Sequence, residues 1–495
     1  MKKYVLVRLL KSIISLLVVV SIVIVMIYRL LDRSKIFEND PGSKKMKGDT
    51  LTIYQYQKYD ELGYLDFVRA GDICTTVYEG DEESITGCKV DGSKLQEDAL
   101  AVYEADGYEI KTLKSGTPYA VHEYSWVELL YHFYARLFDF DGVNKIQDDE
   151  NPDLERKLYW GKNPYNGTPA LLCSGCEYKY QLYFNSSFPF IHSNWFHFDF
   201  GTSYPDNKGI DVMQVISDGQ GAVKNSTQTF PTGLTEESAL IQTTCKYKSS
   251  TDHLDAKRFD DNYADCRSAY ESPSMINTSY IEGILSLILA YVVAMPAGLA
   301  MARNKDKLGD KIGIVYINVL IAVPSLAFIF FMRSIGTLLG LPDKFPMLGF
   351  KDIRSWIMPI VILGLMSTPG LMMWLRRYML DQSNADYVKF ARAKGLSQKE
   401  IFRKHILRNA IIPIVNGIPA SIILSISGAF ITESAFAVPG MGKMLPTALS
   451  KLNNNMVICL VFIFTALSIF SVLAGDLLMT LVDPRISLTA KGGDK

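Results

Sequence analysis

The chain has 495 residues, of which 48% are hydrophobic and 21% are charged, and its formal net charge is −1. This composition excludes a disordered or collagen-like chain, and the balanced charge excludes a basic nucleic-acid-binding protein. The charge is unevenly distributed: residues 29–273 hold 25 Lys and Arg against 40 Asp and Glu, whereas the rest holds 26 and 12. We therefore expect two parts that lie in different environments.

Six apolar segments are long enough to cross a bilayer. They cover residues 12–28, 274–302, 312–332, 356–375, 411–436 and 456–481. Basic residues precede the first segment, and no small-residue cleavage site follows it, so we expect an uncleaved anchor rather than a signal peptide. The predicted parts are a tail with the first span (1–30), a large insert (31–273), a five-helix core (274–486) and a short tail (487–495).

Lysine and arginine placement predicts the orientation of the spans, because these residues gather on the cytoplasmic side. The N-terminus is basic, the loop 303–311 carries four basic residues, and the segment 376–410 carries nine against three acids. With six spans, these segments share one side. Both termini are then cytoplasmic and residues 31–273 are extracellular.

The predicted fold class is an α-helical integral membrane protein with an inserted extracellular α+β domain. Residues 178–184 form a strand-like aromatic run, and residues 127–138 have apolar side chains at helical spacing. The spans contain six prolines, including Pro324, which suit a bundle that moves or encloses a path, although proline is also frequent in membrane helices in general. We expect Glu282, Glu433 and Asp476, near the span ends, to reach the membrane interface.

Six of the seven cysteines lie in the insert, and an even number outside the cytoplasm predicts disulfides. Pairing sequence neighbours gives one of several possible patterns: Cys74 with Cys88, Cys173 with Cys176, and Cys245 with Cys266. The spacing of Cys173, Cys176, His192 and His197 also matches a zinc template. An oxidising location favours the disulfide, and we expect no metal site.

Residues 386–410 predict two short helices on either side of a glycine. Gly395 is suited to the left-handed turn that ends the first helix. Ser397 and Glu400 have the spacing of a capping box at the start of the second. A rigid elbow of this kind can bind a partner's groove, although the charge pattern alone is equally compatible with a solvated basic loop.

This segment resembles the cytoplasmic EAA-type coupling loop of ABC-importer permeases, in the version of the dipeptide and oligopeptide class. The match runs from Asp386-Tyr-Val through Ala391-Arg-Ala-Lys-Gly395 to Arg408-Asn-Ala and Pro413. One departure is Lys389, which occupies the position where the general motif has an acid. The resemblance implies that the following residues couple the chain to an ATPase: Tyr387, Ala391, Arg392, Ala393, Lys394, Gly395, Leu396, Ser397, Glu400, Ile401, Phe402 and His405.

Flanking motifs resemble the same class. Arg376-Arg-Tyr-Met379 resembles its exit from the third core span, and Asp483-Pro-Arg485 resembles its carboxy-terminal motif. Residues 196–216 resemble its outer Gly-x-Ser segment and the short helix after it. An outer turn motif is formed by Glu433, Phe436, Pro439, Gly440 and Gly442. A second departure is Asn454-Asn-Met456, which stands where the class often has Arg-Asp-Tyr-Pro.

The resemblance implies a type I ABC-importer permease with a MetI-like core, which moves oligopeptides across the cytoplasmic membrane of a Gram-positive bacterium. Its implied partners are a second permease of the OppC type, two ABC ATPases, an extracellular peptide-binding lipoprotein and the bilayer, but no nucleic acid. ATP and magnesium would bind to the ATPases, so this chain is expected to need no cofactor and to be no enzyme. Gly442-Lys443 does not complete a P-loop, because Ala437 and Met444 replace the required Gly and Ser/Thr.

Three alternatives stay open at this point. A membrane sensor would need a cytoplasmic signalling domain, and a membrane-embedded enzyme would need clustered acid and base residues near the span ends. Within transport, the substrate could be dipeptides, nickel chelates or sugars.

Overall fold

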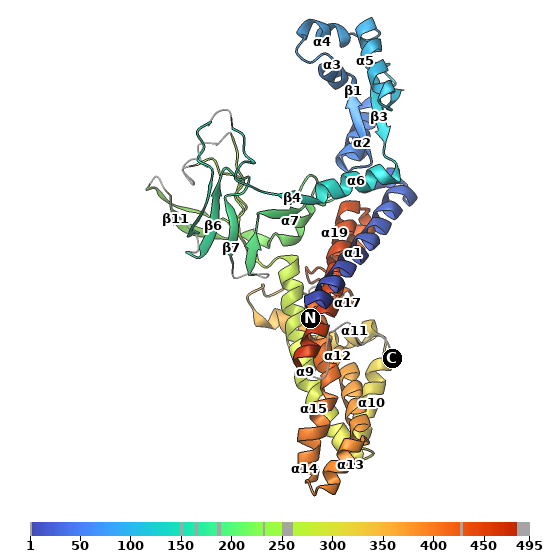
Figure 1. Cartoon of the computed structure of the whole chain (residues 1–495), viewed down its shortest axis with the longest axis vertical. Coiled ribbons are helices and arrows are strands. Elements are labelled where there is room, and N and C mark those ends of the chain that lie inside the picture. The colour runs from blue at the N-terminus through green and yellow to red at the C-terminus, as the bar shows by residue number, and fades with distance from the viewer. Residues whose placement is uncertain are drawn as a thin grey trace.

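The computed structural model describes residues 2–148, 152–163, 167–185, 190–230, 233–249, 261–425 and 429–482, with only the backbone of 2–5, 481 and 482. The molecule is elongated, with a helical bundle at one end and two lobes of the insert at the other (Figure 1). The Asp483-Pro-Arg485 motif and the tail 487–495 lie outside the described residues.

Four helices are long and apolar enough to cross a membrane within the described part of the chain. They are α1 (Lys2–Leu30), α9 (Met275–Arg303), α12 (Ile353–Ser383) and α19 (Asn454–Val482). Two further candidates are bent pairs, which raise the number to six if each pair counts as one span.

The first bent pair differs from the continuous span expected over residues 312–332. The chain forms α10 (Leu308–Ala322) and α11 (Ser325–Leu338), whose axes differ by 108°. Pro324 explains the break, because proline offers no N–H to the carbonyl of Leu320 and pushes the preceding residue out of helical geometry. Val323 is accordingly extended, with φ −72° and ψ 128°.

The second bent pair joins residues 398–410 to α16 (Ile412–Ser425) at 44°. The segment expected as one span, 411–436, ends in a separate helix, α17 (Phe430–Phe436), followed by α18 (Met444–Lys451).

Small residues bring α9 and α12 into close contact at the centre of the bundle. A Cβ atom added at Gly298 would lie 3.2 Å from the carbonyl oxygen of Met372, and one at Gly364 would lie 3.0 Å from that of Ser286. Such close backbone approach is how small residues promote helix association in membranes. Larger side chains at either glycine would separate the two helices.

The insert between α1 and α9 mixes helices and antiparallel strands. Its first lobe combines the sheet β1-β3-β2 with helices, and its second contains the sheet β5-β6-β7-β8 and two-stranded ribbons. The helical elements are η1 (Arg33–Phe37), η2 (Ser43–Lys45), α2 (Gly48–Glu61), α3 (Ala70–Val77), α4 (Glu82–Cys88), α5 (Lys94–Ala105), α6 (Trp126–Leu137) and α7 (Val212–Ser217). The strands are β1 (Leu65–Arg69), β2 (Glu109–Thr112), β3 (Pro118–Glu123), β4 (Phe138–Phe140), β5 (Lys157–Lys162), β6 (Pro169–Ser174), β7 (Tyr180–Phe184), β8 (Ile191–Ser193), β9 (Phe196–Phe198), β10 (Gln220–Val223), β11 (Asn225–Thr229), β12 (Thr235–Ala239) and β13 (Tyr270–Ser272).

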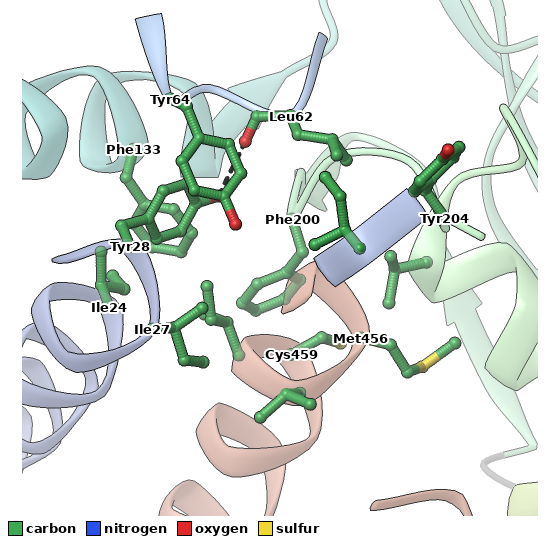
Figure 2. Packing of buried hydrophobic residues seen from close by; sticks show 14 of the residues in the cluster. Ile24, Ile27, Tyr28, Leu62, Tyr64, Phe133, Phe200, Tyr204, Met456 and Cys459 are labelled. Atoms are coloured by element: carbon green, nitrogen blue, oxygen red, sulfur yellow. Dashed lines mark hydrogen bonds between the residues drawn. The ribbon is translucent and has the colours of Figure 1, made fainter. Parts of the chain in front are cut away.

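One buried apolar cluster joins the insert to the first and last helices. Figure 2 shows Ile24 and Tyr28 of α1, Tyr64 and Phe200 of the insert, and Cys459 of α19 within it. All five side chains are less than 9% exposed. The insert, α1 and α19 therefore share one continuous apolar core.

Three disulfides join the six cysteines of the insert as sequence neighbours: Cys74–Cys88, Cys173–Cys176 and Cys245–Cys266. The Cys173–Cys176 bond leaves no thiolate for the zinc template. His192 and His197 instead lie against the rings of Tyr183 and Tyr178.

Candidate transport machinery

The elbow, which we define as residues 386–410, lies at the end of the molecule opposite the insert (Figure 1). It begins with α13 (Asp386–Ala393), which a glycine terminates. Gly395 has φ +78°, its N–H donates to the carbonyl of Arg392 at 3.0 Å, and the N–H of Leu396 donates to that of Ala391 at 3.2 Å. This is the hydrogen-bond pattern of a Schellman turn, which favours glycine at its left-handed position.

The second half of the elbow starts at Ser397 and continues through α14 (Gln398–Glu400), the π-helical segment η3 (Ile401–Ile406) and α15 (Leu407–Ala410). The Ser397 hydroxyl accepts from the N–H of Glu400 at 3.3 Å and donates to its carboxylate at 3.2 Å. The capping serine is present, but the carboxylate bonds the hydroxyl rather than the backbone of Ser397.

Buried side chains attach the elbow to the bundle. Val388, Ala391 and Ile401 are at most 5% exposed and belong to one cluster with Leu375 and Met379 of α12. The elbow therefore rests on α12 through closely packed side chains.

The tip of the elbow is free of such contacts. The residues of the coupling motif from Arg392 to Ser397 are exposed, while Tyr387, Glu400, Phe402 and His405 are partly buried. Phe390 was missed by sequence reasoning and is 70% exposed. Phe390 directly precedes the buried Ala391 and so points to another side of this short helix. That position was the signal for an exposed aromatic side chain. Lys389 makes an exposed ion pair with Asp386 at 2.8 Å.

An ion pair between Asp310 and Arg376, which sequence reasoning missed, fixes the loop before α10. Asp310, fully buried, accepts from Nε and an amino group of Arg376 at 2.6 and 2.7 Å, and from the N–H of Asp306 at 2.9 Å. Arg376 belongs to the expected exit motif of α12. The bidentate pair holds the start of α10 against α12 near the elbow.

The Glu433 turn, which we define as residues 429–443, is organised by one carboxylate. Glu433 is fully buried and accepts from the Ser279 hydroxyl at 2.8 Å and from the N–H groups of Ala429 and Lys443 at 3.2 and 3.0 Å. The turn wraps so closely that a Cβ at Gly440 would lie 2.4 Å from the Glu433 carboxyl carbon, and one at Gly442 would lie 2.8 Å from the nitrogen of Phe430. Both glycines are thus required by close approach.

We expected Glu282, Glu433 and Asp476 to reach the membrane interface. This prediction is wrong for Glu282 and Glu433. Glu433 is buried by its own turn, and Glu282, one helical turn after Ser279, is only 2% exposed. Both Glu282 oxygens lack a hydrogen-bond partner among the described residues. Asp476 is partly exposed and pairs with Arg8.

The other members of the outer turn motif contact different neighbours. Phe436 is buried, and its carbonyl accepts from the N–H of Phe345 at 2.8 Å. The carbonyl of Pro439 accepts from the side chain of Gln220, which lies in the insert, at 3.2 Å. The Glu433 turn is therefore a contact point between the bundle and the insert.

An asparagine triplet, Asn453–Asn455, joins α19 to the insert. In the sequence, part of this triplet was seen only as a departure from the motif of the permease class. Each side chain is buried and donates to a different residue: Asn453 to the hydroxyl of Ser203 at 2.8 Å, Asn454 to that of Tyr64 at 2.6 Å, and Asn455 to the carbonyl of Thr202 at 3.0 Å. These amides form hydrogen bonds with buried polar groups of the insert at the N-terminal end of α19.

Replacing Asn454 with leucine should loosen this joint, because it leaves the buried Tyr64 hydroxyl without its partner. We expect a loss of about 1–3 kcal/mol in stability, seen as faster trypsin cleavage of the insert in membrane vesicles. The control is Asn384→Leu at the exposed end of α12, which should not change the cleavage rate. Equal rates for both variants would contradict the role of the triplet.

Asp40 forms a buried polar centre within the insert. Its carboxylate accepts from the hydroxyls of Tyr54 and Tyr204, both at 2.6 Å, from the N–H of Gly42 at 2.7 Å, and from the ammonium of Lys208. Burial raises the pKa of Asp40, but the bonds from Lys208, Tyr204 and Tyr54 outweigh burial and hold the pKa below its usual range.

This centre predicts a pH-dependent contribution to stability. Because the folded pKa of Asp40 is lowered, the contribution is present above the unfolded carboxyl's pKa of about 4 and is lost as the pH falls through the folded value. Asp40→Asn should therefore lower the free energy of unfolding by about 1–3 kcal/mol at pH 7, with a gap that narrows below pH 4. Thermal unfolding of the original protein and of the variant, at pH 7 and below pH 4, measures this difference in the free energy of unfolding. A gap that widens in acid would contradict it.

Comparisons with known proteins agree with this architecture. The family model described as "Binding-protein-dependent transport system inner membrane component" matches residues 294–488. The chain is thus a multi-pass protein of the cytoplasmic membrane in the permease class of ABC transporters, a class that is not itself catalytic.

More specific relatives are peptide permeases. The chain is 43% identical to the oligopeptide transport system permease protein AmiC of Streptococcus pneumoniae, with both chains covered in full. It is 31% identical to the dipeptide permease DppB of Lactococcus lactis, over 42% of this chain and 67% of that one, and 29% identical to the oligopeptide permease AppB of Bacillus subtilis, over 41% and 67%. The chain belongs to this family of oligopeptide and dipeptide transport permeases. The match to AmiC includes the insert.

Proposed function

We propose that this chain is the permease subunit of an importer that moves oligopeptides across the cytoplasmic membrane. The observation that carries the proposal is the elbow, whose buried face packs on α12 while its tip exposes Phe390 and the motif residues. An exposed aromatic side chain on a rigid base is suited to a partner's groove. Full-length similarity to an oligopeptide permease supports the choice of substrate.

In this proposal the chain crosses the membrane six times, with each bent helix pair counted as one span. Both termini and the elbow are cytoplasmic, and the insert, residues 31–273, is an extracellular domain. The lysine and arginine residues of the elbow support this orientation. The three disulfides of the insert are also suited to an oxidising environment.

The partners in this proposal are a second permease of the OppC type, two ABC ATPases that bind and hydrolyse ATP with magnesium, and a peptide-binding lipoprotein. Closure of the ATPases moves the elbow through contacts at its tip. The packed cluster of Val388, Ala391 and Ile401 passes that motion to α12, and the Asp310–Arg376 pair carries α10 with it. Alternating access follows from two arrangements of these packed helices.

Uptake of a labelled hexapeptide tests the proposal in cells that lack this gene and in cells where it is restored. Loss of uptake, with rescue by the restored gene, is the expected result. Unchanged uptake in a strain without another peptide importer would exclude oligopeptides. The same cells can then be tested with dipeptides, nickel chelates and sugars.

A further inference from the structure

The break between α10 and α11 opens onto a cavity of about 330 Å³. The cavity is lined by residues 320–325, together with Phe328 of α11 and Met366 of α12. Figure 1 shows α10 following the long axis of the bundle, with α11 lying across it. The cavity therefore lies where the chain leaves helical geometry.

Main-chain groups at this break have no partner in the part of the chain that the structure describes. No hydrogen bond there reaches the carbonyl oxygens of residues 320–322, and none leaves the N–H groups of residues 325 and 326. The bonds on either side resume with Val323 donating to Val319 and Phe328 donating to Pro324. Of these groups, the three carbonyl oxygens and the N–H of Ser325 belong to residues that line the cavity.

In the six-span arrangement proposed above, these groups lie at membrane depth. The 15 residues of α10 rise about 22 Å, and the hydrocarbon core is about 30 Å thick. Ile321 and Leu326, on either side of the break, are 60% and 51% exposed, so this face is not covered by the chain itself. Unpaired main-chain groups cannot face lipid, and irregular backbone at this depth lines a water-filled path or another protein.

Resting on the proposed function, we propose that this cavity binds the main chain of the transported peptide. An extended peptide presents alternating N–H donors and carbonyl acceptors, which match the acceptors and donors of the break. Such contacts do not depend on the side chains of the peptide, so the cavity would accept peptides of many sequences. The wall formed by Phe328 and the flexible Met366 adapts to different side chains. The volume, at the lower end of ligand pockets, holds a short stretch of peptide.

Photocrosslinking in the assembled transporter tests the site. A photoreactive benzoylphenylalanine replaces Phe328 in one variant and Phe331 in the other, which lies on the same helix, outside the cavity, and is 64% exposed. In vesicles that import a fluorescent hexapeptide, the Phe328 variant should label at least tenfold more strongly than the Phe331 variant. Unlabelled peptide should remove the signal.

Equal labelling at both positions, or crosslinking of the Phe328 probe to the second permease instead of the peptide, would overturn the site while leaving import intact. Vesicles of the unmodified transporter that import no peptide would overturn the proposed function, and this site with it. A second pair of variants avoids the probe: Ala322→Trp fills the cavity and should reduce uptake at least tenfold, whereas Ala327→Trp, on α11 outside the lining, should not. Equal uptake by both would also count against the site.

Discussion

Replacing Gly395 with proline should abolish peptide import while the protein still inserts into the membrane. Proline cannot adopt the φ of +78° found at this position, and it removes the N–H that bonds to Arg392. The turn between α13 and α14 would reopen and the tip would lose its shape. We expect at least a hundredfold lower uptake of labelled hexapeptide, with an unchanged amount of protein in membrane fractions.

Two companion variants separate shape from contact at the tip. Gly395→Asn should keep most of the import, because asparagine tolerates the left-handed region. Phe390→Ala should reduce import at least tenfold without lowering the unfolding temperature, because this exposed side chain packs on nothing that its removal would disturb. A further variant, Ala391→Asp, places a charge on the buried face of α13 and should also abolish import. Full import by both Gly395→Pro and Ala391→Asp would refute the coupling role of the elbow.

Glu433→Leu should destabilise the protein strongly. The substitution leaves the Ser279 hydroxyl and two backbone N–H groups without their acceptor inside a closed turn. At about 1–3 kcal/mol for each of these three unsatisfied buried groups, the total is roughly 3–9 kcal/mol. The expected result is a large drop in the unfolding temperature of the purified transporter and a reduced yield in membranes.

The matched control is Glu282→Gln on the facing helix α9. That carboxylate is also buried, but its oxygens have no partner among the described residues, so neutralising it should leave the unfolding temperature unchanged or raise it. Glu433→Gln should lie between the two, because an amide keeps one acceptor. Equal loss of stability in Glu282→Gln and Glu433→Leu would show that burial of the carboxyl, rather than its bonds, determines the effect.

The features that sequence predicted well depend on short stretches of chain. Gly395 and Ser397 act on neighbours a few residues away, so spacing alone was enough to place a turn and a helix start there. Residues 127–138 gave the helix α6 because amphipathic spacing is local as well. Hydropathy predicted the four long apolar helices α1, α9, α12 and α19 of the described residues, because length and composition decide whether a segment can cross a bilayer.

The features that it missed depend on long-range contacts. Asn454 meets Tyr64, 390 positions away, and Asn453 meets Ser203, 250 positions away, so nothing near the triplet indicates a polar joint. Glu433 was placed at the interface because its burial comes from a turn that folds back over it. The break at Pro324 was hidden because hydropathy measures apolar content and does not register a change of direction.

The pairing of the first helix with the last has a consequence for biosynthesis. Tyr28 of α1 donates to Asn455 of α19, and 427 positions separate the two residues. A ribosome must therefore complete nearly the whole polypeptide before this contact can form, and until then α1 and the insert expose an apolar surface that α19 later covers. Chains that stop before residue 453 lack the asparagine triplet as well as this cover, and they are expected to be recognised by membrane quality-control proteases as unfinished.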